Sequence, residues 1–485
     1  MNFKLKPLFL SALLIIFVSC TSWQEPAAMS DEEPGIFPDY SGVTVPANIA
    51  PMNFMLEGAM GIQAVFYLDG EEVARVRGKE ETIGIPQKKW KEILASAKGK
   101  SISVEVSVWD EEHPDGLGYK PFEINIALEE MDPWIAYRLI EPGYVGWRQL
   151  GIYQREVSSF EESAIITNKE SNTTCLNCHN FPSFSSESMM FHARGANGGT
   201  ILYNDGKLTK IDFKSIGPKK NTTYPAWHPD GRFIAFSSNT THQLFFAEGK
   251  QPIEVFDSAS DLVLYDIQTG EALTDPRFLA KESLESFPAW SPDGKYLYFV
   301  SAEDVNLDVK FTPTARYHLL RVPFDTHTRT FGEKIDTIYN AHTRGGSVSY
   351  PRISPDGRYL LYTLSDYGTF PIWHDEADLK MMDLQTMKDV DISIWNADES
   401  ADSYHSWSSN GRWVMYGTRR LDGRYTRVYM AYLSEDGTPG KPFLLPQEDP
   451  RHNVWRLKSY NVPEFIDGKV ALPEEAAELF HSAAK

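Results

Sequence analysis

YPAWHPDGRFIAF, at residues 224–236, is the stretch that decides the fold, because its pattern returns three more times in the chain. The later copies are FPAWSPDGKYLYF at 287–299, YPRISPDGRYLLY at 350–362 and YHSWSSNGRWVMY at 404–416. Their glycines stand at positions 231, 294, 357 and 411, so the copies are 63, 63 and 54 residues apart. Repeats of this length, made of apolar strands and turn residues, predict the blades of a β-propeller.

Each copy carries an Asp-Gly or Asn-Gly turn between two apolar runs. Glycine adopts a positive φ at little cost, and the Asp or Asn side chain hydrogen-bonds to the turn backbone. A turn role explains Asp230, Asp293 and Asp356 together, so we do not assign them to catalysis. The fourth copy differs from the others, because it has His405 in place of Pro and Asn410 in place of Asp.

The S-P-D-G-[RK]-[YF] core of these copies resembles the TolB-like β-propeller family, over residues 200–466. The resemblance implies five or six blades. We expect residues 200–213 to form a partial blade that strands from the C-terminus complete, since this closure removes free sheet edges. Residues 467–485 are expected to be a C-terminal tail.

A second, smaller β domain is predicted for residues 40–165. Residues 61–76 have the pattern of a hairpin around Asp69-Gly70. One helix is expected at residues 87–97, with Trp90 on its apolar face. The predicted fold class is therefore all-β, with an N-terminal β-sandwich-like domain followed by a five- or six-bladed propeller.

The motif CLNCH, at residues 175–179, has the spacing of covalent haem attachment. Cys175 and Cys178 would bond to the two vinyl groups as thioethers, and His179 would be the proximal iron ligand. Two other interpretations stay open. One is a disulfide or dithiol of the two cysteines, and the other is a zinc site that adds a distant fourth ligand to the three residues.

The candidates for a sixth iron ligand follow the motif closely. His192 is the leading distal ligand, Met189 and Met190 are alternatives, and Arg194 is available for a haem propionate. Each of the three candidate ligands could instead be packed in a core. The haem-binding segment, residues 166–199, is short, so we expect the β domain or the propeller mouth to cover both faces of the ring.

Residues 1–19 are typical of a secretion signal, because two lysines precede an apolar run that is too short to span a bilayer. The segment ends at Cys20 in a pattern that resembles a bacterial lipoprotein box, which predicts a lipid on this cysteine. Residues 20–39, rich in Glu, Pro, Ala and Ser, are expected to be a tether. Export agrees with haem attachment, which takes place outside the inner membrane in bacteria.

The location and charge limit the partners. No Asp stands at positions 21–23, so we predict anchoring in the outer membrane, facing either the periplasm or the cell surface. Loss of the two lysines of the signal leaves 45 basic against 67 acidic residues, a formal charge of 45 − 67 = −22. Such a surface repels nucleic acid.

The predicted function is that of an envelope lipoprotein with covalent haem c, for electron transfer or for redox or ligand sensing, whose propeller docks a protein or redox partner. The architecture looks like a group of secreted lipoproteins of the Bacteroidetes type. The alternative is a non-catalytic envelope binding or scaffold lipoprotein with a structural metal or haem. A glycan-active hydrolase is less expected, since no pair of carboxylates stands out by motif and no G-x-S-x-G occurs.

Overall fold

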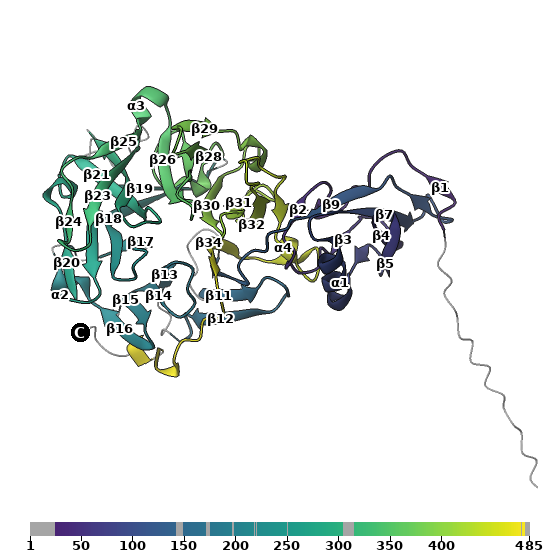
Figure 1. The fold of residues 1–485 in the computed structure, drawn as a ribbon, viewed down its shortest axis with the longest axis horizontal. Coiled ribbons are helices and arrows are strands. Elements are labelled where there is room, and N and C mark those ends of the chain that lie inside the picture. Colours follow the sequence, from purple (N-terminus) through teal and green to yellow (C-terminus); the bar gives the residue numbers. More distant parts are fainter. Residues whose placement is uncertain are drawn as a thin grey trace, which may run out of the picture.

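The computed structural model describes residues 25–141, 149–170, 175–195, 198–217, 219, 221–249, 251–303, 315–476 and 478–480. The chain is mainly β, and an N-terminal mixed sheet is followed by a six-bladed β-propeller (Figure 1). Among the described residues, no helix is both long enough and apolar enough to cross a membrane.

The N-terminal domain is built on one seven-stranded sheet. Its strands are β1 (Ala28–Met29), β2 (Thr44–Val45), β4 (Gly61–Leu68), β5 (Glu71–Arg77), β7 (Ser101–Trp109), β8 (Leu117–Gly118) and β9 (Phe122–Ile126). The main order is β1-β8-β7-β4-β5, and β9 pairs with both β7 and β2. The β1/β8 and β2/β9 pairs are parallel, so the sheet is mixed. A two-stranded sheet of β3 (Phe54–Met55) and β6 (Thr82–Ile83) accompanies it.

Two local predictions for this domain are confirmed. The hairpin of β4 and β5 turns at Asp69 and Gly70, both of which have positive φ. Helix α1 (Gln87–Ala97) buries Trp90, whose ring meets that of Phe66 edge-on at a centroid distance of 6.5 Å. The alternating strands thus gain an apolar partner in the helix, which buries one face of the sheet.

The propeller has six four-stranded blades, one of which carries an additional strand. Blade 1 is β34 (Ser459–Ile466), β10 (Trp134–Ile140), β11 (Gly151–Glu156) and β12 (Glu162–Thr167). Blade 2 is β13 (Cys175–Asn180), β14 (Met189–Arg194), β15 (Gly199–Asn204) and β16 (Lys207–Ile211). Blade 3 is β17 (Thr223–Trp227), β18 (Phe233–Phe245), β19 (Ile253–Asp266) and β20 (Glu271–Leu273).

The other three blades follow the same plan. Blade 4 is β21 (Ser283–Trp290), β22 (Tyr296–Glu303), β23 (His318–Asp325) and β24 (Thr330–Phe331), with β25 (Asp336–Tyr339) also paired to β23. Blade 5 is β26 (Ser347–Ile353), β27 (Tyr359–Ser365), β28 (Asp378–Asp383) and β29 (Lys388–Val390). Blade 6 is β30 (Asp402–Trp407), β31 (Trp413–Thr418), β32 (Arg427–Tyr432) and β33 (Phe443–Leu444).

Short helices lie in the connections. They are α2 (Phe213–Ile216), η1 (Pro276–Phe278), α3 (Ala341–Arg344), η2 (Pro371–Trp373), η3 (Ser393–Trp395), α4 (His452–Trp455), η4 (Glu474–Ala476) and η5 (Glu478–Phe480). Each sequence repeat joins the first and second strands of one blade, and its Asp-Gly turn lies between them. In blade 3, Gly231 has a φ of 75°, and the Asp230 carboxylate accepts a hydrogen bond from the Arg232 backbone at 2.8 Å. This turn chemistry is the role that the sequence analysis gave to the aspartate.

The C-terminal strand closes the ring, but at a different blade from the one expected. β34 pairs with β10 and becomes the innermost strand of blade 1, which the sequence analysis had placed in the N-terminal domain. The reason is that residues 134–167 form only the three strands β10, β11 and β12, so the inner edge of β10 needs a partner strand. Residues 200–211 are instead the outer half of blade 2, and the expected haem segment supplies its inner half.

The domain boundaries therefore differ from the predicted ones. The propeller begins near Trp134, and residues 166–199 belong to its first two blades. The expected tether is partly folded, because Ala28–Met29 pairs with β8 and Phe37 bridges to Met55. Residues 1–24, which include the predicted signal and the predicted lipid site Cys20, lie outside the described residues.

Candidate functional site

The innermost strands of the six blades share one backbone feature. Each has a β-bulge with one residue at a positive φ between 46° and 53°. These residues are Cys178, Tyr224, Phe287, Tyr350, Tyr404 and Val462. The C-x-x-C-H motif therefore lies on a propeller strand, and Cys178 takes the position that an aromatic residue takes in blades 3 to 6.

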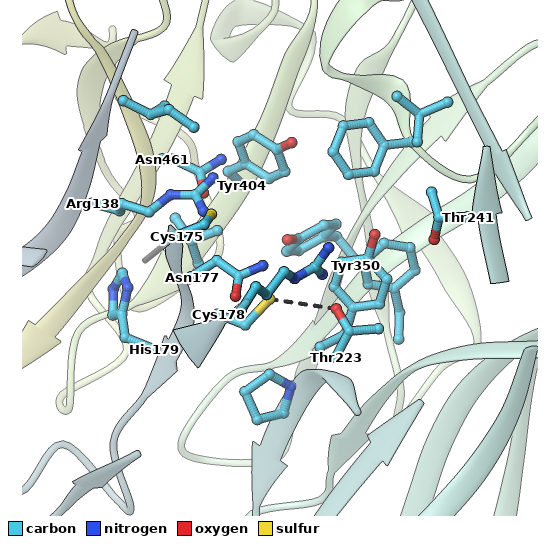
Figure 2. A pocket seen from close by; sticks show the side chains of 18 of the residues that line it. Arg138, Cys175, Asn177, Cys178, His179, Thr223, Thr241, Tyr350, Tyr404 and Asn461 are labelled. Atoms are coloured by element: carbon cyan, nitrogen blue, oxygen red, sulfur yellow. Dashed lines mark hydrogen bonds between the residues drawn. The ribbon is translucent and has the colours of Figure 1, made fainter. Parts of the chain in front are cut away.

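A cavity of about 170 Å³ lies where these strands meet, and we call it the channel cavity. All six blades contribute to its wall, and Figure 2 shows most of the side chains that line it. The residue after the bulge is Pro in four blades, whereas blade 2 has His179 and blade 6 has His405. The positive-φ residue of the bulge lines the cavity in all six blades, so the cavity is built from one repeated backbone element.

Both cysteines of the motif are free and belong to this wall. Cys178 is partly exposed, and its sulfur lies 3.4 Å from the Thr223 hydroxyl, as the dashed line in Figure 2 shows. Cys175 is buried, and burial raises the pKa of its thiol. The two thiols thus open into one space but differ in their access to solvent.

In the part of the chain that the structure describes, three arginines line the channel cavity, whereas no Asp or Glu side chain does. They are Arg138 from blade 1, Arg194 from blade 2 and Arg352 from blade 5. Within the described residues, none of them forms an ion pair with a carboxylate within 4 Å, and the buried Nε of Arg138 has no hydrogen-bond partner. In a chain with 67 acidic and 47 basic residues, this is a cationic interior open to an anionic group.

The arginines are held mainly by backbone and amide groups. Arg138 donates to the Leu176 carbonyl at 3.2 Å, and Arg352 donates to the carbonyl of Pro351 at 3.3 Å. With its amide oxygen turned toward Arg194, Asn177 accepts two hydrogen bonds from that guanidinium at 3.0 and 3.1 Å. These partners carry no charge, and the buried carboxyl group of Glu464 is an acidic neighbour whose pKa the charge of Arg352 lowers against the larger effect of burial.

Aromatic rings form the apolar part of the wall. Tyr224 and Phe287 have ring centroids 4.1 Å apart, Phe287 and Tyr350 are 4.5 Å apart, and Tyr350 and Tyr404 are 5.0 Å apart. The bulges of blades 3 to 6 thus place a continuous run of aromatic rings beside Cys178. Contacts of this kind are typical of an aromatic or flat apolar ligand site.

The His179 imidazole is almost fully buried at the edge of this wall. Its Nε2 lies 3.5 Å from the Glu464 Oε2, and the ring also hydrogen-bonds to the Val462 backbone. Burial, together with the nearby Arg138, lowers the pKa of His179 to about 3, and burial raises the pKa of Glu464 to about 7. The imidazole is therefore neutral, which is the protonation state of a metal ligand.

The other candidate ligands lie elsewhere. Met189 and Met190 are fully buried in two different apolar clusters, and neither lines the channel cavity. His192 lines a neighbouring cavity, where its Nδ1 is 2.9 Å from the Thr200 hydroxyl. Arg194 lines both cavities. The structure thus brings together Cys175, Cys178, His179 and Arg194, and it leaves the predicted distal ligands outside this group.

The chemistry of the lining fits a haem c. Thiols are present for the vinyl groups, guanidinium groups for the propionates and aromatic rings for the faces of the macrocycle. The aromatic rings of the channel wall are the kind of apolar cover that a haem would need. The volume of about 170 Å³ is below the roughly 300–1,000 Å³ of small-molecule clefts, so side chains at the rim must rearrange to admit the ring.

The zinc interpretation gains no further ligand. Within the described ranges, no three or more His, Cys, Asp or Glu side chains are grouped so that they could hold a metal ion.

Two site residues were missed by the sequence analysis, Arg138 and Arg352. A signal existed for the second, because Arg352 stands where the earlier copies of the repeat have Ala226 and Ala289.

No family model matches the chain, and no curated protein matches it. Among solved structures, it is similar to a puromycin hydrolase, with a TM-score of 0.31 and 15% identity over 63% of this chain and 39% of that one. It is also similar to a prolyl endopeptidase, with a TM-score of 0.34 and 13% identity over 66% of this chain and 51% of that one. It is similar as well to the periplasmic gluconolactonase of Pseudomonas aeruginosa, with a TM-score of 0.33 and 13% identity over 70% of this chain and 100% of that one.

The chain thus spans about half or less of the length of the puromycin hydrolase and of the prolyl endopeptidase. All three TM-scores are below 0.5. The assignment of six blades rests on the strand pairing of the chain itself.

Proposed function

We propose that the protein is an envelope lipoprotein that holds a covalent haem c in the channel cavity and serves electron transfer or redox or ligand sensing. One observation carries the proposal: the two free thiols of the C-x-x-C-H motif line the same cavity as three arginines, and no carboxylate of the described residues lines it. The thiols alone are compatible with a dithiol, but a cationic, aromatic surrounding matches the propionates and the ring of a haem.

In this proposal Cys175 and Cys178 form the thioethers, and Arg138, Arg194 and Arg352 are within the wall that receives the propionates. His179 would be the proximal ligand, and its Nε2, which lies 3.5 Å from the Glu464 Oε2 and has no hydrogen-bond partner among the described residues, would bind the iron. A bound haem supplies one-electron exchange and, with an open sixth position, binding of small ligands. The aromatic wall excludes water from the ring faces.

The location and family belong to the same proposal. A lipid on Cys20 anchors the chain in the outer membrane, and the propeller surface docks a protein or redox partner. The repeats and the motif together are consistent with a TolB-like propeller lipoprotein of the Bacteroidetes type. Turnover is not part of the proposal, since no catalytic pair has been assigned.

The test is the pyridine haemochrome spectrum of the full chain, purified from cells that mature c-type cytochromes. The expected result is a covalent haem spectrum in the wild type and none in the Cys175→Ser/Cys178→Ser variant. The Thr223→Val variant is the matched control, because it removes the hydroxyl beside Cys178 but keeps both thiols. Colourless wild-type protein would contradict the proposal.

A second candidate function follows from the volume of the cavity. A cavity of about 170 Å³ with three arginines that form no ion pair within the described residues suits a small carboxylate without any haem, which agrees with the alternative of a binding lipoprotein. Calorimetry with acetate, benzoate and citrate tests this candidate on haem-free protein. Binding that is lost in Arg352→Gln, in protein without covalent haem, would favour it over the first proposal.

A further inference from the structure

A second cavity, of about 470 Å³, lies between blades 2 and 3, and we call it the interblade cavity. Its volume is within the range of small-molecule sites. Strands β14, β15 and β18 contribute to its wall, together with residues 211–214 and 221–223. Arg194, Thr223 and Thr241 line both this cavity and the channel cavity, so the two are neighbours.

Three glycines, Gly195, Gly198 and Gly199, line the interblade cavity. A Cβ at Gly198 would lie 2.6 Å from the Ala193 carbonyl oxygen, which is too short without a shift of the backbone. A Cβ at Gly199 would lie 3.0 Å from the Ile211 carbonyl oxygen, which is a tight contact. These glycines therefore contribute backbone without side chains to the wall of the cavity.

Two buried side chains of this wall have a polar atom without a partner. Asn239 is 5% exposed and His192 is 4% exposed, and both line the interblade cavity. In the part of the chain that the structure describes, neither the Asn239 Oδ1 nor the His192 Nε2 has a hydrogen-bond partner. A buried polar atom that stays unpaired destabilises the folded protein by roughly 1–3 kcal/mol. Hydrogen-bonding groups of a ligand that enters the cavity would remove this penalty.

The orientation of Asn239 defines what the cavity requires. Its Nδ2 donates to the Asp257 carboxylate at 2.6 Å and to the Ser286 hydroxyl at 3.3 Å. Because a carboxylate only accepts, the amide nitrogen faces Asp257, and the Oδ1 is left as an acceptor. Thr241 also donates to Asp257, at 2.7 Å, which fixes this carboxylate. A ligand must therefore donate a hydrogen bond to Asn239.

The remaining wall offers hydroxyl groups and mixed charge. Thr200 contacts His192 at 2.9 Å and the Thr222 hydroxyl at 3.2 Å, and these hydroxyls can both donate and accept. Arg194 and Lys214 line the cavity together with Asp212, so two positive charges stand against one negative charge and the wall does not favour a cation. Sulfate, which has only acceptors at neutral pH, leaves the Asn239 oxygen unpaired.

From this pattern we infer that the interblade cavity binds a neutral, hydroxyl-rich molecule of monosaccharide size. Hydroxyl groups can donate to Asn239 and accept from the threonines, and several of them fit a volume of about 470 Å³. The inference goes beyond the proposed haem site and does not rest on it, because it uses the unpaired atoms of His192 and Asn239.

The test is calorimetry of the full chain with glucose, N-acetylglucosamine and myo-inositol, and with sulfate and tetramethylammonium as charged comparisons. We expect at least one of the three polyols to bind, and we expect sulfate and tetramethylammonium to bind no more strongly than that polyol. Asn239→Ala should weaken binding by about tenfold, the usual loss for a buried hydrogen bond. Thr240→Trp, at an exposed residue of the wall, should abolish it by filling the cavity.

The control variant is Thr330→Trp, which adds the same side chain at an exposed strand position that does not line the cavity. It should bind as the wild type does. The Cys175→Ser/Cys178→Ser variant should also keep polyol binding, so a failure of the haem proposal is distinguishable from a failure here. Absence of binding by all three polyols, or binding that Thr240→Trp leaves unchanged, overturns the inference.

Discussion

The His374 Nε2 lies 3.0 Å from the Glu254 Oε2, and both side chains are almost completely buried. Glu254 is the second residue of the long strand β19 of blade 3, whereas His374 follows η2 in the connection between β27 and β28 of blade 5. The same two segments supply Val255 and Phe370 to the channel cavity. This pair therefore joins two parts of the cavity wall that come from different blades.

The His374–Glu254 pair predicts a pH-dependent stability. Burial alone would lower the pKa of His374, but the hydrogen bond to Glu254 and the Glu376 carboxylate, 3.3 Å from the His374 Nδ1, outweigh it and raise the pKa to about 9. Because the folded pKa lies above the unfolded value of about 6.5, the stabilisation is full below pH 6.5 and is lost as the pH rises through 9. His374→Gln should therefore cost about 3 kcal/mol at pH 6 and little at pH 10.

Urea unfolding at these two pH values measures this difference. The groups that face His374 are Glu254, Glu376 and the ring of Tyr367, whose hydroxyl also donates to Glu254. The control is His327→Gln, at an exposed histidine, which should change the free energy of unfolding little at either pH. An effect of His374→Gln that is equal at pH 6 and pH 10 would contradict the prediction.

The cysteines of the motif should differ in reactivity when the chain is made without haem. Cys178 is partly exposed, whereas Cys175 is buried and its thiol pKa is raised. Since the thiolate is the reactive form, we expect Cys178 to be alkylated at least about tenfold faster at pH 8. Iodoacetamide labelling followed by peptide mass spectrometry measures each rate.

The single variants serve as controls for each other. Cys175→Ser should keep the fast labelling of Cys178, and Cys178→Ser should leave only the slow reaction of Cys175. Equal rates for the two thiols would show that their environments are not those of the structure.

The Asn-Gly turn of blade 6 contacts the N-terminal domain. The Asn410 Nδ2 donates to the Glu130 carbonyl at 2.6 Å, and its Oδ1 accepts from the Arg412 backbone at 3.0 Å. An aspartate keeps the turn but has no donor for Glu130. Asn410→Asp should therefore destabilise the protein by about 1 kcal/mol, the value of one exposed hydrogen bond.

Thermal unfolding of this variant checks the value, and the reverse change in blade 5, Asp356→Asn, is its control. Asp356 occupies the same place in the turn and accepts from the Arg358 backbone at 3.0 Å, so either residue can serve there. Its substitution should change the melting temperature less than Asn410→Asp does. A loss of equal size in both variants would assign the effect to the turn alone.

The repeats made blades 3 to 6 predictable, because each copy combines an aromatic-proline pair, a tight turn and an apolar strand. Blade 2 escaped detection for a physical reason. The strand requires a residue that tolerates positive φ at the bulge, and Cys178 and His179 fill the places of the aromatic residue and the proline. The aromatic residue that follows, Phe181, corresponds to Trp227 in blade 3, and this was the remaining signal.

The candidate site was predictable only where a motif carried it. Cys175, Cys178, His179 and Arg194 stand close in sequence, and the structure places them at one cavity. Arg138 and Arg352 lie on other blades, so their approach depends on ring closure by β34, which local patterns do not encode. Blade 1 itself was assigned to the wrong domain because its inner strand comes from the other end of the chain.

The equivalence of His179 and His405 allows a sharp test of the proximal ligand. Both follow a positive-φ residue, both are buried, and burial lowers the pKa of both to about 3. Proline occupies this position in the other four blades, so His179→Pro and His405→Pro should each keep the fold. Loss of a buried ring should cost each variant about 1–3 kcal/mol.

Only His179 adjoins the thiols, whereas the His405 Nε2 lies 3.1 Å from the Leu361 carbonyl oxygen. If His179 ligates iron, the visible spectrum of the native protein should change in His179→Pro and stay as in the wild type in His405→Pro. Circular dichroism confirms that both variants are folded. A haem protein whose spectrum is the same in the two variants would exclude His179 as the ligand, because the shared backbone position removes any difference in folding.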